Sequence, residues 1–143
     1  MKKIRFLLVP MAMIMLVLLS ATQVYADNIR VLVDGEALQF RDQVPIIVDE
    51  RTLVPIRFVF ETLGFEVEWD TTTQTAVITR PGDMITVTVG SNIFVTSGVE
   101  HTLDVAAEII GGRIMVPLRF PLESVGYRLA WDGTTRTVSV YTR

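Results

Sequence analysis

The chain has 143 residues, with 16 acidic side chains against 13 basic ones, one histidine, no cysteine and a formal net charge of −3. The acidic excess argues against nucleic acid and anionic lipid surfaces as partners, because both carry negative charge. Without cysteine, stability has to come from packing and polar pairing rather than from disulfides.

The first 26 residues have the pattern of a secretory signal peptide. Three basic residues among the first five precede an uncharged apolar run over residues 6–19, and residues 24–26 supply a small-residue cleavage pattern. The alternative is an uncleaved membrane anchor, because residues 6–26 carry no charge. We expect cleavage before Asp27, which predicts a secreted or cell-surface, extracytoplasmic protein with no membrane segment after cleavage.

A hairpin is predicted at the start of the chain that follows this leader. Apolar residues over 29–33 and 37–40 flank Asp34-Gly35, a dipeptide that favours the tight turn of a two-residue hairpin. A short apolar run over residues 44–48 follows, and it leads to a turn at residues 49–51.

A short helix is predicted next. Pro55 suits the first helical turn, where its missing N–H costs nothing. Apolar residues recur at helical spacing from Ile56 to Leu63, and Gly64 is a natural residue to end the helix. A helix of about ten residues forms because it packs, not because it is stable alone.

Strict alternation follows the helix. Phe65, Val67 and Trp69 fall on one strand face, while the two glutamates between them face the other way. Residues 70–74 form a threonine-rich turn, and residues 75–79 form the returning strand. The segment is therefore predicted to be a second hairpin.

The second half of the chain repeats the first. Residues 51–80 align with residues 113–142 at a constant shift of 62 positions, and 12 of the 30 aligned pairs are identical. The repeat predicts an α+β fold with two tandem repeats, about 29–80 and 85–143. Each repeat would consist of antiparallel β-hairpins with one short α-helix packed on the sheet. The sequence leaves open whether the two copies share one sheet or form two lobes.

The repeat also selects candidate site residues, because a structural residue is needed in every copy whereas a catalytic residue is usually needed once. The residues that recur, and that we interpret as a structural repeat motif, are Pro55, Arg57, Glu61, Gly64, Trp69, Asp70, Pro117, Arg119, Glu123, Gly126, Trp131 and Asp132.

The motif arginines are either ligand-binding groups or structural ones. Each lies four residues before a glutamate, near the start of its helix, and this order opposes the helix dipole, so helix support alone is a weak explanation. We predict instead that each arginine forms a bidentate pair with the aspartate of the Trp-Asp turn. Arg57 would pair with Asp70, and Arg119 would pair with Asp132.

The two motif tryptophans have two readings as well. Exposed tryptophan rings stack on sugars in wall-binding modules, whereas Trp69 and Trp131 share strand faces with apolar neighbours. The alternation favours a place in the core for both rings.

No catalytic, cofactor or metal site is expected. His101 lies in the polar stretch Glu100-His101-Thr102, and no nucleophile-elbow signature accompanies it. No loop has the dense alternating carboxylates of a calcium site, and no glycine-rich phosphate loop is present.

The motif carries a family resemblance. The pattern Gly-Arg-x-hydrophobic-Val-Pro-Leu-Arg-Phe, then Glu-x-x-Gly, then Trp-Asp-x-x-Thr-x-Thr runs from Gly112 to Thr137 and recurs in the first half. It resembles the copper amine oxidase N-terminal-like (stalk) domain family, over about residues 29–143. The resemblance implies a small α+β accessory module of an exported bacterial protein, and not the oxidase core.

The residues give no support to amine oxidation itself. A copper site of that kind needs several imidazoles, and the chain has only His101. The self-processed quinone cofactor needs a tyrosine that follows an asparagine, and no such pair occurs.

We therefore predict a non-catalytic, secreted binding or spacer module at the bacterial cell envelope, which mediates protein–protein interaction or self-association. The alternative is a module that binds peptidoglycan or another cell-wall polysaccharide. An enzyme is the third and weakest reading.

Overall fold

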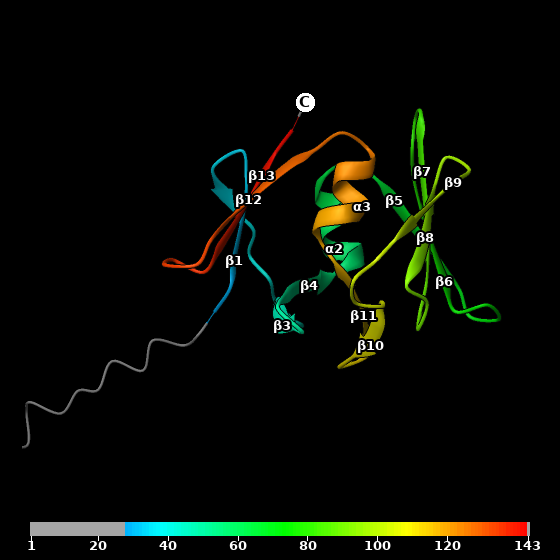
Figure 1. Ribbon diagram of the computed structural model, residues 1–143, viewed down its shortest axis with the longest axis horizontal. Helices are drawn as coiled ribbons and strands as arrows, with labels where there is room; N and C mark the ends of the chain where they lie inside the picture. Colours follow the sequence, from blue (N-terminus) through cyan, green and yellow to red (C-terminus); the bar gives the residue numbers. More distant parts are fainter. Residues whose placement is uncertain (1–27, 143) are drawn as a thin grey trace, which may run out of the picture.

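The computed structural model describes residues 28–142, so the predicted signal peptide at residues 1–26 lies outside the described part of the chain (Figure 1). Within the described part, the predicted α+β class is wrong. Those residues are mostly β, with 13 strands in three sheets and only 2 helices. The helices have only seven and six residues, and the threonine- and valine-rich segments around them form strands.

The N-terminal sheet joins the two ends of the described chain. Its strands, in spatial order, are β12 (Arg128–Asp132), β13 (Thr137–Tyr141), β1 (Arg30–Val33) and β2 (Glu36–Ala37). Strand β1 pairs in parallel with β13 and antiparallel with β2. The predicted hairpin at Asp34-Gly35 is confirmed, and both residues have positive φ, +47° and +87°, as its tight turn requires.

The five-stranded sheet is an antiparallel meander on the opposite side of the molecule (Figure 1). Its strands are β5 (Glu66–Asp70), β6 (Thr75–Arg80), β7 (Asp83–Thr88), β8 (Ile93–Thr96) and β9 (Val99–Thr102). The predicted hairpin at residues 65–79 is confirmed as β5 and β6.

The central sheet brings the two halves of the chain together. Its strands, in spatial order, are β10 (Glu108–Ile110), β11 (Arg113–Pro117), β4 (Arg51–Pro55) and β3 (Ile46–Val48). Val54 of β4 lies opposite Val116 of β11 in the antiparallel register, and these two residues are aligned with each other in the sequence repeat. An antiparallel pair that matches a residue with its own repeat partner has local two-fold symmetry.

Two short helices lie between the outer sheets and above the central sheet (Figure 1). Helix α2 (Ile56–Thr62) and helix α3 (Arg119–Ser124) both end as the sequence predicts. The N–H of Gly64 donates to the Glu61 carbonyl and the N–H of Gly126 to the Glu123 carbonyl, each at 3.0 Å. Both glycines have the positive φ that favours glycine at this position.

One arginine links the two halves next to the helices. The Arg80 guanidinium lies over the Phe65 ring at 4.2 Å from its centroid and donates to the Tyr127 hydroxyl, and these two aromatic residues are repeat partners. Burial alone would lower the pKa of Arg80, but hydrogen bonds to Asp83 and Tyr127 outweigh it and raise that pKa.

A single hydrophobic core contains side chains from both copies of the repeat and from both outer sheets. Its members are Ile29, Val31, Val54, Ile56, Val59, Phe60, Phe65, Val67, Ala76, Ile78, Ile85, Val87, Phe94, Leu103, Ala107, Val116, Leu118, Leu122, Val125, Tyr127, Val138 and Val140. Each helix contacts the hairpin of its own copy, α2 on β5 and α3 on β12, but the predicted two-repeat α+β hairpin fold is wrong. The hairpins of the two copies belong to different sheets, and their inner faces meet in one core.

The shared core predicts one cooperative unfolding transition. Phe60 and Leu122 are fully buried repeat partners. We expect Phe60→Ala to lower the free energy of unfolding by about 3–5 kcal/mol and Leu122→Ala by about 2–5 kcal/mol, each through a residual cavity. Urea unfolding followed by tryptophan fluorescence and circular dichroism measures both. Phe60→Leu, which copies the residue of the other repeat, should cost less than Phe60→Ala. Two separate transitions, of which each variant shifts only one, would contradict a shared core.

Candidate binding grooves

Two grooves open on the surface of the described chain. The first groove, of about 490 Å³, is lined by Phe40, Arg41, Asp42, Gln43, Pro55, Ile56, Arg57, Phe58, Glu61, Val67, Trp69, Ile109, Gly112, Arg113 and Ile114. The second groove, of about 620 Å³, is lined by Ile47, Glu50, Arg51, Thr52, Asp104, Pro117, Leu118, Arg119, Phe120, Glu123, Leu129, Trp131 and Val138. Both volumes are within the range of small-ligand sites.

The two grooves are copies of each other. Twelve lining positions of the first groove recur in the second at a shift of 62 residues, in one direction or the other. Trp69 corresponds to Trp131, and Ile109 corresponds to Ile47. The local symmetry of the central sheet therefore extends to the molecular surface.

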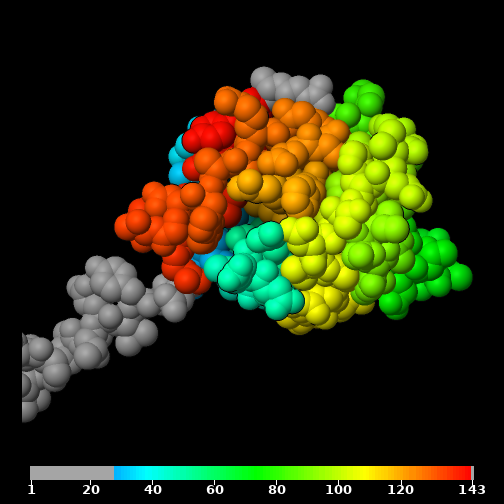
Figure 2. Space-filling view, viewed as in Figure 1, coloured from blue at the N-terminus to red at the C-terminus, as the bar shows by residue number. Residues whose placement is uncertain are grey.

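Each groove needs both halves of the chain. The first groove combines helix α2 and strand β5 with the β10–β11 hairpin, whereas the second combines α3 and β12 with the β3–β4 hairpin. In Figure 2 the cyan β3–β4 hairpin lies beside the orange and red β12–β13 hairpin, on the side where the second groove opens. This arrangement follows from the pairing of β4 with β11. Because of that pairing, the hairpin that contains each central strand lies beside the helix of the other half of the chain.

An ion pair closes the same end of each groove. Arg113 contacts Asp42 at 2.8 Å in the first groove, and Arg51 contacts Asp104 at 2.6 Å in the second. All four side chains are about half exposed or more, so each pair orients the rim of its groove and adds little stability. Asp42 and Asp104 were not among the predicted site residues, although they are 62 positions apart, and an extension of the repeat alignment toward the N-terminus would have matched them.

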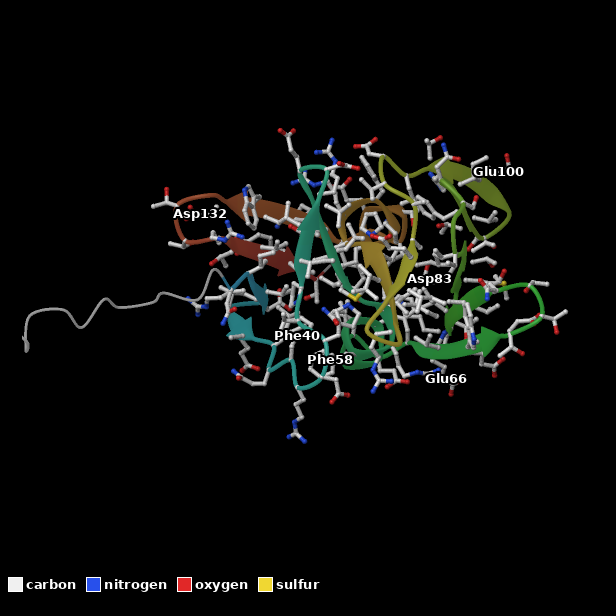
Figure 3. The ribbon with its side chains drawn as sticks, turned by 90° about the horizontal axis from the view of Figure 1, so that it is seen from below. Phe40, Phe58, Glu66, Asp83, Glu100 and Asp132 are labelled. Carbon is white, nitrogen blue, oxygen red and sulfur yellow. The ribbon has the colours of Figure 1, made fainter. Side chains whose placement is uncertain are left out.

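The predicted arginine–aspartate pair does not form. The Arg57 Nη1 atom donates to Glu61 Oε1 at 3.0 Å and to the Val67 carbonyl at 2.9 Å, so it attaches helix α2 to strand β5. Arg119 lies 4.0 Å from Glu123, at the limit of an ion pair. The prediction fails because the Trp-Asp turn points away from the helix, at the end of a hairpin, where Asp132 is labelled in Figure 3.

The aspartates of the two turns have a local partner instead. Asp70 Oδ1 accepts the backbone N–H of Thr72 at 2.8 Å and of Thr73 at 3.3 Å. Asp132 makes the same two bonds to the equivalent residues, at 2.9 and 3.3 Å. This geometry is an Asx turn, which holds the hairpin loop. The backbone bonds from Thr73 and Thr72 also lower the pKa of the Asp70 carboxyl.

The tryptophans line the grooves. Trp69 is half-buried against the core, but Trp131 is 42% exposed. The prediction that both rings belong in the core is therefore wrong for Trp131. Alternation gives the face of a strand but not how well that face is covered: β5 and β12 are both edge strands, yet β5 has a buried residue and β12 has none.

The two grooves differ in one aromatic contact. In the first groove, Phe40 packs against Phe58 with ring centroids 5.0 Å apart, and both residues are labelled in Figure 3. In the first groove, Phe40 lies two residues before the ion-pairing Asp42. The corresponding residue in the second half of the chain, two residues before Asp104, is Thr102. No aromatic ring contact is recorded for Phe120, the repeat partner of Phe58, within residues 28–142.

The remaining candidate groups stay apart from the grooves. His101 stacks on Phe94 with centroids 4.9 Å apart, and it lines neither groove. Within residues 28–142, no group of three or more His, Asp or Glu side chains is placed to hold a metal ion. In the same part of the chain, none of the helices has the length and apolar character needed to cross a membrane.

Comparison with known families agrees with the motif. The model of the copper amine oxidase N-terminal domain matches residues 32–140, so the chain belongs to this family. The predicted family is confirmed. In the family this domain is a non-catalytic, stalk-like accessory domain. The comparison with curated proteins gave no significant match.

The different contacts of the two motif arginines predict different effects on stability. Arg57→Met removes a bond to a strand carbonyl, so we expect the free energy of unfolding to fall by about 0.5–1.5 kcal/mol. Arg119→Met, the matched control, should change it by less than about 0.5 kcal/mol, because the ion pair of Arg119 with Glu123 is long and exposed. Urea denaturation of both variants measures the difference. Equal effects of the two substitutions would contradict the role of Arg57 as a helix–strand link.

The turn aspartate predicts an acid-dependent contribution to stability. Because the pKa of Asp70 is lowered from 3.8 in the folded protein, its carboxylate stabilises the fold above that value. The contribution is lost as pH falls through the lowered folded pKa. We expect Asp70→Asn to be less stable than the wild type at about pH 6, and the difference to shrink at about pH 2.5. Urea unfolding at the two pH values measures this; a difference that does not depend on pH would contradict it.

Proposed function

We propose that this protein is a non-catalytic, exported module of the bacterial cell envelope that binds a protein partner or a second copy of itself and so acts as a connector or spacer. The leader pattern at residues 1–26 supports export. The observation that carries the binding role is the duplicated groove, in which exposed aromatic and aliphatic side chains lie beside paired charges.

The chemistry of the grooves supports binding rather than catalysis. Neither groove is lined by His, Ser, Cys or Lys, so both lack the histidine-activated serine or cysteine of triad-type sites. Their arginines and carboxylates face each other in pairs, which suits orientation of a ligand. An aromatic ring with an apolar wall and a charged rim is the usual composition of a recognition surface.

One observation favours a second candidate function. The exposed ring of Trp131 could stack on a sugar, and a polymer of repeating units could occupy both grooves at once. Peptidoglycan or another cell-wall polysaccharide is therefore the alternative ligand.

Retention on cell walls separates the two candidates. We expect the full chain to stay in solution when it is mixed with purified, protein-free walls, and to be retained when envelope proteins are left on them. Quantitative immunoblotting of the pelleted and soluble fractions measures both. Retention on protein-free walls that soluble wall oligosaccharides remove would overturn protein binding in favour of the polysaccharide.

A further inference from the structure

We propose that the second groove binds an aromatic side chain carried by an extended, basic segment of a partner protein. This inference rests on the proposed function, and it identifies the chemistry of the partner. The evidence comes from the first groove, because the protein fills the corresponding site there with its own residue.

The first groove contains its own aromatic occupant. Phe40 belongs to the irregular segment that connects β2 with β3, and its ring packs on Phe58 of helix α2. Asp42, two residues later, binds Arg113 and fixes this segment at the rim. The shape of this groove therefore accommodates an aromatic side chain that packs on Phe58 and lies next to an acidic residue at the rim.

The second groove has the same walls without that occupant. Phe120 takes the place of Phe58, and Asp104 with Arg51 closes the rim as Asp42 and Arg113 do. Thr102 stands where Phe40 would stand and does not line the groove. Consistent with this, the second groove is the larger one, and its tryptophan is the exposed one. The volume of about 620 Å³ leaves room for an aromatic side chain in this groove, and burying it against Phe120 and Trp131 is favourable.

The charged lining of the second groove indicates which residues of the partner lie beside its aromatic anchor. The second groove is lined by three carboxylates, of Glu50, Asp104 and Glu123, against the two guanidinium groups of Arg51 and Arg119. The first groove has the opposite balance, three arginines against two carboxylates. The second groove therefore favours a partner with basic side chains beside the anchor.

Glu50 is held at the rim in a backbone conformation that costs free energy. The β3–β4 turn places Asp49 and Glu50 at φ of +46° and +64°, whereas the equivalent β10–β11 turn uses Gly111 and Gly112. Positive φ is costly for residues with a Cβ and is easily adopted by glycine. A carboxylate kept at such a position, facing the second groove, fits a role in binding a cation.

The neighbouring strand suits an extended partner. Strand β3 is at the edge of the central sheet, and Ile47 on it is 42% exposed and lines the second groove. An edge strand leaves backbone N–H and C=O groups free to pair with an added strand. The partner segment can therefore pair along β3 while its aromatic side chain enters the second groove.

Short synthetic peptides test the proposal with the purified full chain. Because side chains two residues apart share one face of an extended segment, the probe is Arg-Ser-Phe-Ser-Arg, and its matched controls are Arg-Ser-Ala-Ser-Arg and Glu-Ser-Phe-Ser-Glu. Isothermal titration calorimetry measures the affinities. We expect the probe to bind about tenfold or more tightly than either control, and its advantage over the acidic control to shrink at high salt. Equal affinities for the basic and acidic peptides would overturn the proposal.

Protein variants locate the binding site. Trp131→Ala should weaken binding of the probe by about tenfold, while Trp69→Ala, the same change in the first groove, should leave it within about twofold. Glu50→Gly, which copies Gly112, should weaken binding by about threefold and raise the melting temperature, so lost folding cannot explain its effect. Equal losses of affinity for the probe from Trp69→Ala and Trp131→Ala would overturn the assignment of the site to the second groove. Unchanged affinity of Glu50→Gly for the probe would overturn it as well.

The remaining outcomes separate this inference from the proposed function. If the full chain captures an envelope protein and Trp131→Ala captures it equally well, protein binding stands and the second groove is not its site. If soluble wall oligosaccharides bind and Trp131→Ala abolishes this, while the peptide does not bind, the occupant is a glycan. That result would overturn both the proposed function and this inference.

Discussion

The pairing of β4 with β11 is the constraint on which the rest of the structure depends. It places Val54 opposite its own repeat partner Val116, and this register relates the two halves by a local two-fold axis. Each central strand carries a hairpin on one side and a helix on the other, so the pairing brings the hairpin of one half to the helix of the other. The last three residues of each strand are buried, so both faces of the pair are packed and a one-residue slip would disrupt that packing.

The sequence repeat produces two related grooves. The residues that differ between the two halves give each groove its own aromatic contacts and its own charge. In the first, the ring of Phe40 covers Phe58, and positive charge prevails. In the second, the corresponding space is open, Trp131 is exposed and negative charge prevails. The residues that both halves retain build the walls, and the residues that differ decide what each groove accepts.

The motif residues divide by the range of their contacts. Gly64, Gly126, Asp70 and Asp132 act within their own turns, and their positions in the sequence were enough to place them in the fold. Arg57 contacts strand β5 farther along the chain, whereas Arg119 lies near Glu123 of its own helix, so the predicted aspartate partner was wrong for both arginines. A hairpin turn projects away from the body of the molecule, so the aspartate at its tip is out of reach of the helix.

The sequence by itself determined the outer hairpins, the helix ends, the family and the repeat, but not the central strands β4 and β11. Periodicity, turn residues and helix ends depend on neighbours in the chain, and the hairpins at Asp34-Gly35 and at residues 65–79 followed from them. Only the tertiary structure decided the mostly β class, the distribution of the hairpins among three sheets and the exposure of Trp131. These features depend on which strands pair across the repeat. That choice is set by burial of both halves in one core, a long-range condition that no local pattern records.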